Sequence, residues 1–178
     1  HPRPDMRHIR PSDVYDLAEL LEKPEYSSIE FNIEGNPYAE EDCNGYPGFI
    51  NLVQEIRPEQ CTLVPDDPNQ LTSDHGWNLT EESNRLSPII KLLKHQNTRV
   101  SCFMDPDLEQ ITLARHAGTD RIELYTGPYA HHFNTPNREK IIDEFVRAGE
   151  HAVSLNIGIN AGHDLNKDNL SIFCSKIP

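Results

Sequence analysis

The chain has 178 residues, of which 36% are hydrophobic, and its 29 acidic and 16 basic residues give a formal net charge of −13. No apolar run approaches the roughly 18 residues of a membrane span, and no basic segment followed by an apolar one suggests a signal peptide. The acidic charge argues against nonspecific binding to nucleic acid or anionic lipid, whereas a small phosphorylated substrate needs only a few local donors.

The four cysteines, Cys43, Cys61, Cys102 and Cys174, form neither a CxxC motif nor any spacing typical of a zinc site. Cys61 and Cys102 lie inside apolar runs and are predicted to be buried thiols. Thiols that stay reduced are typical of a cytoplasmic protein. We therefore expect a cytoplasmic location and no metal.

The first half of the chain alternates between helix-like and strand-like patterns. The predicted elements are a helix that follows Pro11 and Ser12 and extends to about Leu21, a strand at 28–34, a loop at 35–48, a helix at 49–56 and a strand at 60–64. In the first strand Ile29, Phe31 and Ile33 should face the helices, because they alternate with polar residues.

The second half continues the alternation after a long polar loop at 66–78. The predicted elements are a helix at 81–95, a strand at 99–104, a helix after it, a strand at 121–125, a helix around 141–146, a strand at 157–160 and a helix at 166–175. Asp105 should cap the helix that follows the third strand, with Pro106 in its first position. His131 and His132 are assigned to a loop.

Five strand–helix units without a linker predict a single α/β domain over residues 1–178, with parallel strands. A (β/α)8 barrel, the TIM barrel fold, typically takes about 250 residues, so this chain would be short of two to three units. An open doubly wound sheet accommodates five strands with nothing missing. The pattern alone leaves both architectures open.

In either architecture, functional residues gather where the strands end. Glu34 ends the first strand, Thr72 follows the second, and His163 follows the fifth. Glu123 lies within the fourth strand on its polar face, where a carboxylate is costly unless paired. A structural ion pair with Arg121 or Arg99 accounts for Glu123 equally well. A single histidine after glycine, such as His163, is more often a turn residue or a helix cap than a catalytic group.

The opening segment His1-Pro2-Arg3-Pro4-Asp5-Met6-Arg7-His8 carries two histidines and two arginines in a strongly acidic protein. Because this local charge opposes the global one, the segment favours an anion-binding loop. The alternative is an exposed polar segment.

The motifs HPRPDMRHI, EFNIEG, LTSDHGW, FMDPDLEQI, RIELYTGPYA and INAGHDL occur in this order. Together they resemble the pyridoxine 5'-phosphate synthase family. The resemblance implies a (β/α)8 barrel, incomplete here because strand 1, most of strand 2 and strand 8 are missing. It implies a homo-oligomer, an octamer in the family, that needs no metal or organic cofactor.

The reaction implied by the resemblance condenses 1-deoxy-D-xylulose 5-phosphate with 3-amino-2-oxopropyl phosphate, giving pyridoxine 5'-phosphate, phosphate and water. The resemblance assigns the role of proton acceptor to His1 and Glu34, and that of proton donor to His163. Glu123 matches a glutamate that steadies the transition state. These are the side chains expected to move protons near neutral pH.

The resemblance also assigns contacts to the two phosphorylated substrates. Arg3, His8 and Thr72 match residues that hold the deoxyxylulose phosphate. Asp164 occupies a position whose backbone contacts the aminoacetone phosphate, although many relatives have glycine there. The loop at 38–48 is longer than usual in the family.

Two other functions remain open at this point. A metal-dependent barrel isomerase or lyase could use His1, Glu34 and His163 as ligands. A catalytically inactive fragment is the non-enzyme alternative, because opening a barrel exposes sheet edges. For the same reason, we expect the chain on its own to be inactive and to associate.

Overall fold

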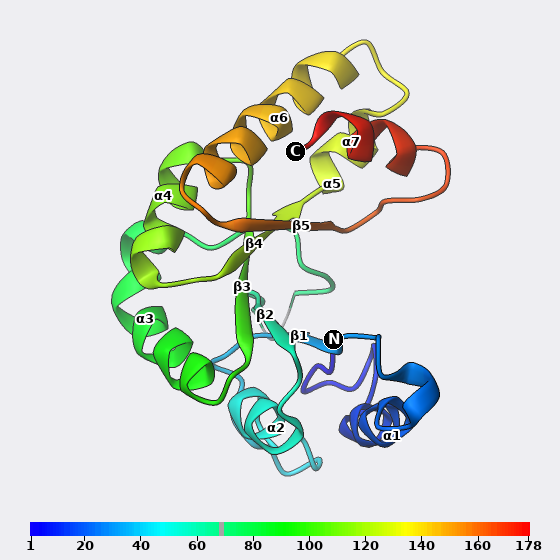
Figure 1. The fold of residues 1–178 in the computed structure, drawn as a ribbon, viewed down its shortest axis with the longest axis vertical. Helices are drawn as coiled ribbons and strands as arrows, with labels where there is room; N and C mark the ends of the chain where they lie inside the picture. Colours follow the sequence, from blue (N-terminus) through cyan, green and yellow to red (C-terminus); the bar gives the residue numbers. More distant parts are fainter. Residues whose placement is uncertain (68–69) are drawn as a thin grey trace. The chain divides into compact units, whose positions relative to one another are not determined.

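The computed structural model describes residues 1–67 and 70–178. Within these ranges the strands are β1 (Asn32–Gly35), β2 (Gln60–Leu63), β3 (Arg99–Met104), β4 (Arg121–Tyr125) and β5 (Gly158–Gly162). The helices are α1 (Pro11–Leu21), α2 (Phe49–Ile56), α3 (Leu79–His95), α4 (Leu108–Ala117), α5 (Gly127–His132), α6 (Arg138–Ser154) and α7 (Leu170–Lys176), with a 3-10 turn at Pro24–Tyr26. The described strands form a parallel sheet in the order β1-β2-β3-β4-β5 (Figure 1). The α/β class is therefore confirmed.

The chain divides into two compact units. Unit 1 consists of His1–Ser73 and Pro88–Ser101, and unit 2 consists of Asp74–Ser87 and Cys102–Pro178. In the described part of both units, no helix combines the length and the apolar composition that crossing a bilayer requires.

Helix α1 of unit 1 starts at Pro11, whereas the sequence pattern placed Pro11 and Ser12 before the helix. The Asp13 carboxylate accepts a hydrogen bond from the backbone N–H of Arg10 at 2.7 Å, and this contact satisfies one donor at the helix start. The hydroxyl of Tyr15 donates to Glu55 Oε2 at 2.7 Å and joins α1 to α2. The two helices lie close together in Figure 1.

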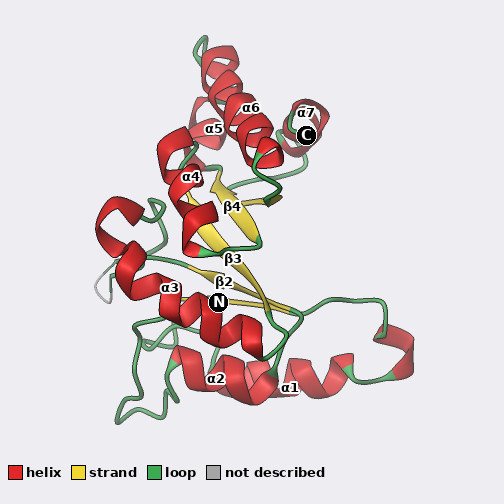
Figure 2. Cartoon of the chain, turned by 60° about the vertical axis from the view of Figure 1, so that its left-hand side comes forward, coloured by secondary structure: helices red, strands yellow, loops and turns green. Residues whose placement is uncertain are grey.

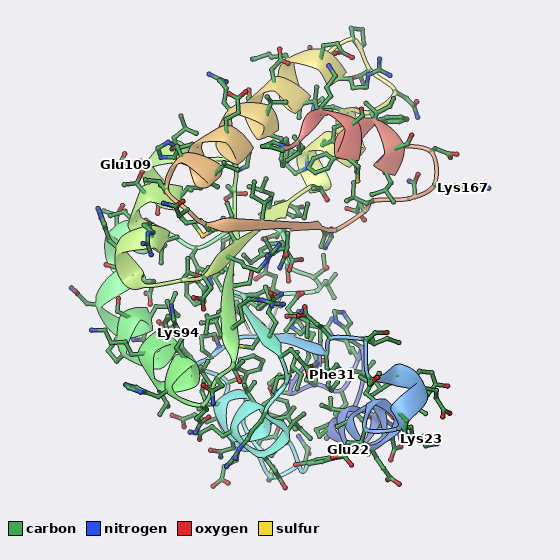
Figure 3. All side chains as sticks on the ribbon, in the orientation of Figure 1. Glu22, Lys23, Phe31, Lys94, Glu109 and Lys167 are labelled. Atoms are coloured by element: carbon green, nitrogen blue, oxygen red, sulfur yellow. The ribbon has the colours of Figure 1, made fainter. Side chains whose placement is uncertain are left out.

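Strand β1 is shorter than predicted, because it begins at Asn32 rather than at residue 28. Its register pairs Asn32 with Gln60, so residue 30 would have to pair with Pro58, which has no N–H to donate. Ile29 is consequently 52% exposed, whereas Ile33 is buried as predicted. Ile29 and Phe31, which is labelled in Figure 3, line a surface hollow in unit 1.

In unit 2, strands β4 and β5 pair in parallel from Arg121 opposite Gly158 to Tyr125 opposite Gly162. Aromatic rings from three helices pack together in its core, with Tyr129 of α5 at 5.2 Å and Phe145 of α6 at 5.5 Å from Phe173 of α7, measured between ring centroids. Figure 2 shows these three helices gathered at one end of unit 2.

Two predictions in unit 2 are wrong. Helix α4 is capped by Asp107, whose carboxylate accepts hydrogen bonds from the N–H groups of Glu109 and Gln110, whereas Asp105 accepts one from Gly76. The segment with the two adjacent histidines is not a loop but helix α5, which is too short to show an apolar periodicity.

Smaller differences concern where the predicted elements begin. Helix α3 begins at Leu79, helix α7 at Leu170 and strand β5 at Gly158. The prediction that Cys61 and Cys102 are buried is confirmed, whereas Cys43 and Cys174 are exposed.

Candidate active site

His1 lies between two carboxylates of unit 1. Its Nδ1 atom is 3.1 Å from Glu34 Oε1, and its Nε2 atom is 3.5 Å from Asp66 Oδ2. Glu34 reaches His1 from the carboxyl end of β1, and Asp66 follows the carboxyl end of β2, so the parallel pairing places both acids at one edge. The structure therefore brings together the two predicted proton acceptors and adds an acid that the sequence had not singled out.

Arg3 is buried, with only 3% of its surface exposed. Its guanidinium donates to Asp66 Oδ2 at 2.6 Å and to the backbone oxygen of Gln70 at 2.5 Å, and its Nε atom lies 3.8 Å from Asp5 Oδ2. The arginine of the predicted anion-binding loop is thus already matched by a carboxylate. A phosphate bound here would use the donors that remain on its five N–H groups.

Arg7 and Asp5 form a second, more exposed pair. The Arg7 Nε atom donates to Asp5 Oδ2 at 2.6 Å, and its guanidinium also donates to the Gln70 backbone oxygen at 2.9 Å. Burial opposes ionisation of Asp5, but hydrogen bonds and charge from Arg7, with the charge of Arg3, lower the pKa of Asp5 overall. Asp5 therefore carries a negative charge at neutral pH.

His8 packs the edge of its ring against His1, with ring centroids 5.3 Å apart and an interplanar angle of 85°. Desolvation lowers the pKa of His8, and the charges of His1, Arg3 and Arg7 lower it further, against an opposing effect of Asp5. His8 is therefore neutral at pH 7.

The His1 and Arg3 side chains line a cavity of about 260 Å³ within unit 1. The loop at 38–48 forms another wall of this cavity, to which it contributes Asp42 and Tyr46. Tyr46 is 1% exposed, and its hydroxyl donates to the backbone oxygen of Pro2 at 3.4 Å. The loop thus closes over the segment that carries His1, which gives it a structural role that the sequence had not suggested.

Thr72 lies elsewhere in unit 1. Its side chain is exposed, and Thr72 is not one of the residues that line the cavity beside His1. The sequence-based assignment of Thr72 to substrate binding stays a prediction.

In unit 2, strand β4 presents Arg121, Glu123 and Tyr125 on one face, while the residues between them are buried on the other. Arg121 donates to the side chain of Asn160 at 2.8 Å. Gly162, opposite Tyr125, leaves room for Glu123: a Cβ atom on Gly162 would lie only 2.4 Å from Glu123 Oε1. The predicted alternation of β4 is confirmed.

His163 and Asp164 follow β5 and both have left-handed backbone conformations, with φ of 87° and 60°. The His163 Nδ1 atom is 2.9 Å from Asp164 Oδ2, and the His163 ring packs edge-on against Tyr125 with centroids 5.1 Å apart. The Asp164 carboxylate thus has a partner in the adjacent imidazole. This contact favours the tautomer in which Nδ1 carries the proton of a neutral ring.

Thr126 is a second residue that the sequence had not singled out. It is fully buried, and its hydroxyl lies against the backbone oxygens of Gly162 and His163, while its N–H donates to Gly162 at 2.9 Å. Thr126 therefore fixes the turn that carries His163. Side-chain-to-backbone contacts between residues so far apart in the sequence give no motif from which they could be predicted.

The described residues contain no group of three or more His, Cys, Asp or Glu side chains placed to hold a metal ion.

The family model described as pyridoxal phosphate biosynthesis protein PdxJ matches residues 1–178. The chain belongs to this family. It is 47% identical over 178 residues to the pyridoxine 5'-phosphate synthase of Porphyromonas gingivalis, a match that covers all of this chain and 68% of that protein. The synthase of Xanthomonas oryzae pv. oryzae is 46% identical with the same coverage. A solved structure, the Amycolatopsis orientalis BexX/CysO complex, matches with a TM-score of 0.46 and 13% identity, over 98% of this chain and 73% of that chain.

Membership of the PdxJ family confirms the resemblance seen in the sequence motifs, and with it an enzyme of vitamin B6 biosynthesis. The roles of individual residues stay predictions.

Proposed function

We propose that this chain carries the catalytic residues of a pyridoxine 5'-phosphate synthase. The reaction joins 1-deoxy-D-xylulose 5-phosphate to 3-amino-2-oxopropyl phosphate and releases phosphate and two molecules of water. The observation that carries the proposal is the PdxJ match over residues 1–178, which includes the His1–Glu34 pair at 3.1 Å.

The condensation requires repeated proton transfers, because an amine adds to a ketone, water leaves, and a ring closes with loss of phosphate. His1 and Glu34 are within hydrogen-bond distance, so a proton taken up by the imidazole can be shared with the carboxylate. We assign these two residues as the proton acceptors in unit 1.

In unit 2 we assign His163 as the proton donor. Its Nδ1 atom contacts Asp164, so its Nε2 atom is the one that can deliver a proton in the imidazolium form. Glu123, seated against Gly162, is assigned to stabilise charge that develops in the transition state. Its carboxylate can do so only toward a group that becomes positive, such as the substrate nitrogen.

The two substrate phosphates are assigned to hydrogen-bond donors in each unit. We assign the deoxyxylulose phosphate to Arg3, His8 and Thr72, and the aminoacetone phosphate to the backbone at Asp164.

The proposal includes the family's (β/α)8 barrel, a homo-oligomer, catalysis without metal or organic cofactor, and a cytoplasmic location. Buried thiols at Cys61 and Cys102 fit a reducing compartment.

The proposal is tested by a hybrid in which residues 1–178 replace the matching 68% of the Porphyromonas gingivalis synthase. We expect the purified hybrid to form pyridoxine 5'-phosphate and release phosphate in equal amounts when given both substrates. The same assay on the 178-residue chain alone shows whether that chain suffices. A folded hybrid that forms no pyridoxine 5'-phosphate from the two substrates would refute the proposal.

A metal requirement is tested with the same hybrid. Activity that a chelator abolishes and that stoichiometric metal restores would favour the metal-dependent isomerase or lyase instead.

A further inference from the structure

Asp66 is a buried carboxylate at the carboxyl end of β2, 6% exposed, to which the family resemblance assigns no role. Its Oδ2 atom accepts a hydrogen bond from Arg3 at 2.6 Å and lies 3.5 Å from His1 Nε2. We propose that Asp66 is a positioning residue that holds Arg3 and His1 in a fixed relation to each other. This inference rests on the proposed function, because it assumes that Arg3 binds a substrate phosphate and that His1 accepts a proton.

The geometry of the contact supports a positioning role. Arginine–carboxylate pairs are frequently bidentate, with two parallel hydrogen bonds that use both oxygens of the carboxylate. Here a single oxygen of Asp66, Oδ2, accepts the hydrogen bond from Arg3 and is also the carboxylate atom closest to His1. A shift of this single atom therefore displaces the phosphate-binding and the proton-accepting groups together.

The second oxygen of Asp66 argues against a purely stabilising role. Oδ1 is buried, and it has no hydrogen-bond partner among residues 1–67 and 70–178. A buried acceptor without a partner destabilises a fold, because the water it loses is not replaced. Asp66 is thus poorly suited to stabilising the fold alone, and its presence is explained if the site requires a negative charge at this point.

Asp66 is itself held in place by its backbone. Its carbonyl oxygen accepts a hydrogen bond from the Asn36 side chain at 2.6 Å, and Asn36 directly follows β1. The carboxyl ends of β1 and β2 are thereby tied together through Asp66. Glu34, which approaches His1 from the other side, lies on the same β1 strand. A rigid support of this kind is what fixes catalytic groups within a fraction of an ångström.

The test uses Asp66→Asn in the hybrid described above. The amide preserves size and can still accept a hydrogen bond from Arg3, but it lacks the charge. We expect a rise of at least about tenfold in both the KM and the calorimetric Kd for 1-deoxy-D-xylulose 5-phosphate, and a fall of at least about tenfold in kcat, the range seen when a supporting residue is removed. Asp66→Glu should recover part of both, because it restores the charge.

A matched control is Glu30→Gln. Glu30 forms an ion pair with Arg99 in unit 1 at the same 2.6 Å distance, away from the cavity. Its loss should leave KM and kcat within about threefold of the parent. A double variant, Arg3→Gln with Asp66→Asn, separates positioning from general damage. If Asp66 acts on binding through Arg3, the double variant binds no more weakly than Arg3→Gln alone.

Two results would overturn the inference. One is unchanged substrate affinity and turnover in folded Asp66→Asn. The other is additive loss of affinity in the double variant, since it would mean that Asp66 acts independently of Arg3. The calorimetric titration needs no turnover, so Asp66 is tested even if the hybrid makes no product, which is the outcome that counts against the proposed function.

Discussion

Replacing Gly162 by alanine should damage catalysis without damaging the fold. The added Cβ atom would lie 2.4 Å from Glu123 Oε1, whereas ordinary contacts begin at 3.4 Å. The carboxylate therefore has to retreat by about 1 Å, a displacement that can reduce turnover about 100-fold when the displaced group acts on the reacting atoms. A 100-fold loss corresponds to about 2.7 kcal/mol of transition-state stabilisation.

The fold should tolerate this change, because the obstructing atom is the end of a flexible side chain and Gly162 does not have a left-handed backbone. Alanine also restricts the unfolded chain, which typically stabilises a protein by about 0.4–1 kcal/mol. We would measure kcat in the hybrid with both substrates saturating, and the free energy of unfolding in urea.

Gly158→Ala is the matched control for this experiment. Gly158 lies on the same face of β5 at its opposite end, and its Cβ atom would lie 2.7 Å from Arg121 Nη1. Functional residues gather at the carboxyl ends of parallel strands, whereas Gly158 lies at the amino end of β5, so we expect kcat to change by less than about threefold. If the Gly162→Ala variant had the kcat of the parent, either Glu123 would have no role in the reaction or its exact position would not matter.

Glu34, His8 and Cys102 can each be tested separately. Glu34→Gln should lower kcat at least about 100-fold while substrate affinity changes little, since a general base typically contributes that much; parental kcat at saturating substrate would exclude Glu34 as a proton acceptor. Histidine NMR should give His8 a pKa below 6.5, and because the unfolded state then binds more protons, the stability of the parent relative to His8→Gln should fall as pH drops below 6.5; a pKa at or above 6.5 would contradict the assigned cause. Burial raises the pKa of Cys102 to about 12, so iodoacetamide should modify exposed Cys43 in the native protein and Cys102 only after unfolding, as mass spectrometry of the peptides can show.

The sequence predicts the order and type of most elements because their apolar residues repeat with the period of a helix or a strand. Boundaries fail where a distant partner decides them: β1 starts late because residue 30 would have to pair with Pro58. Helix α4 is capped by Asp107 rather than by Asp105, because the Asp105 carboxylate accepts a hydrogen bond from the backbone N–H of Gly76. Such contacts involve residues that are far apart in the chain and leave no local pattern.

The same distinction applies to the candidate site. Motifs and strand ends identify His1 and Glu34, which the structure brings to 3.1 Å. Sequence patterns do not identify Asp66, because its partner Arg3 lies 63 positions away in the chain. An acidic residue in a polar loop also cannot be distinguished by sequence from one that is simply exposed to solvent. Glu123 could be placed on its face by alternation, but its fit against Gly162 is visible only once β4 and β5 are paired.

The left-handed pair His163 and Asp164 has a consequence for directed evolution. Each non-glycine residue in this conformation costs about 1–2 kcal/mol, and glycine would relieve that strain at once. A library selected only for survival on heating should therefore be enriched in glycine at these positions, and glycine at 163 would remove the side chain that we propose as the proton donor. Selection for heat resistance in this protein needs a simultaneous requirement for growth without added vitamin B6.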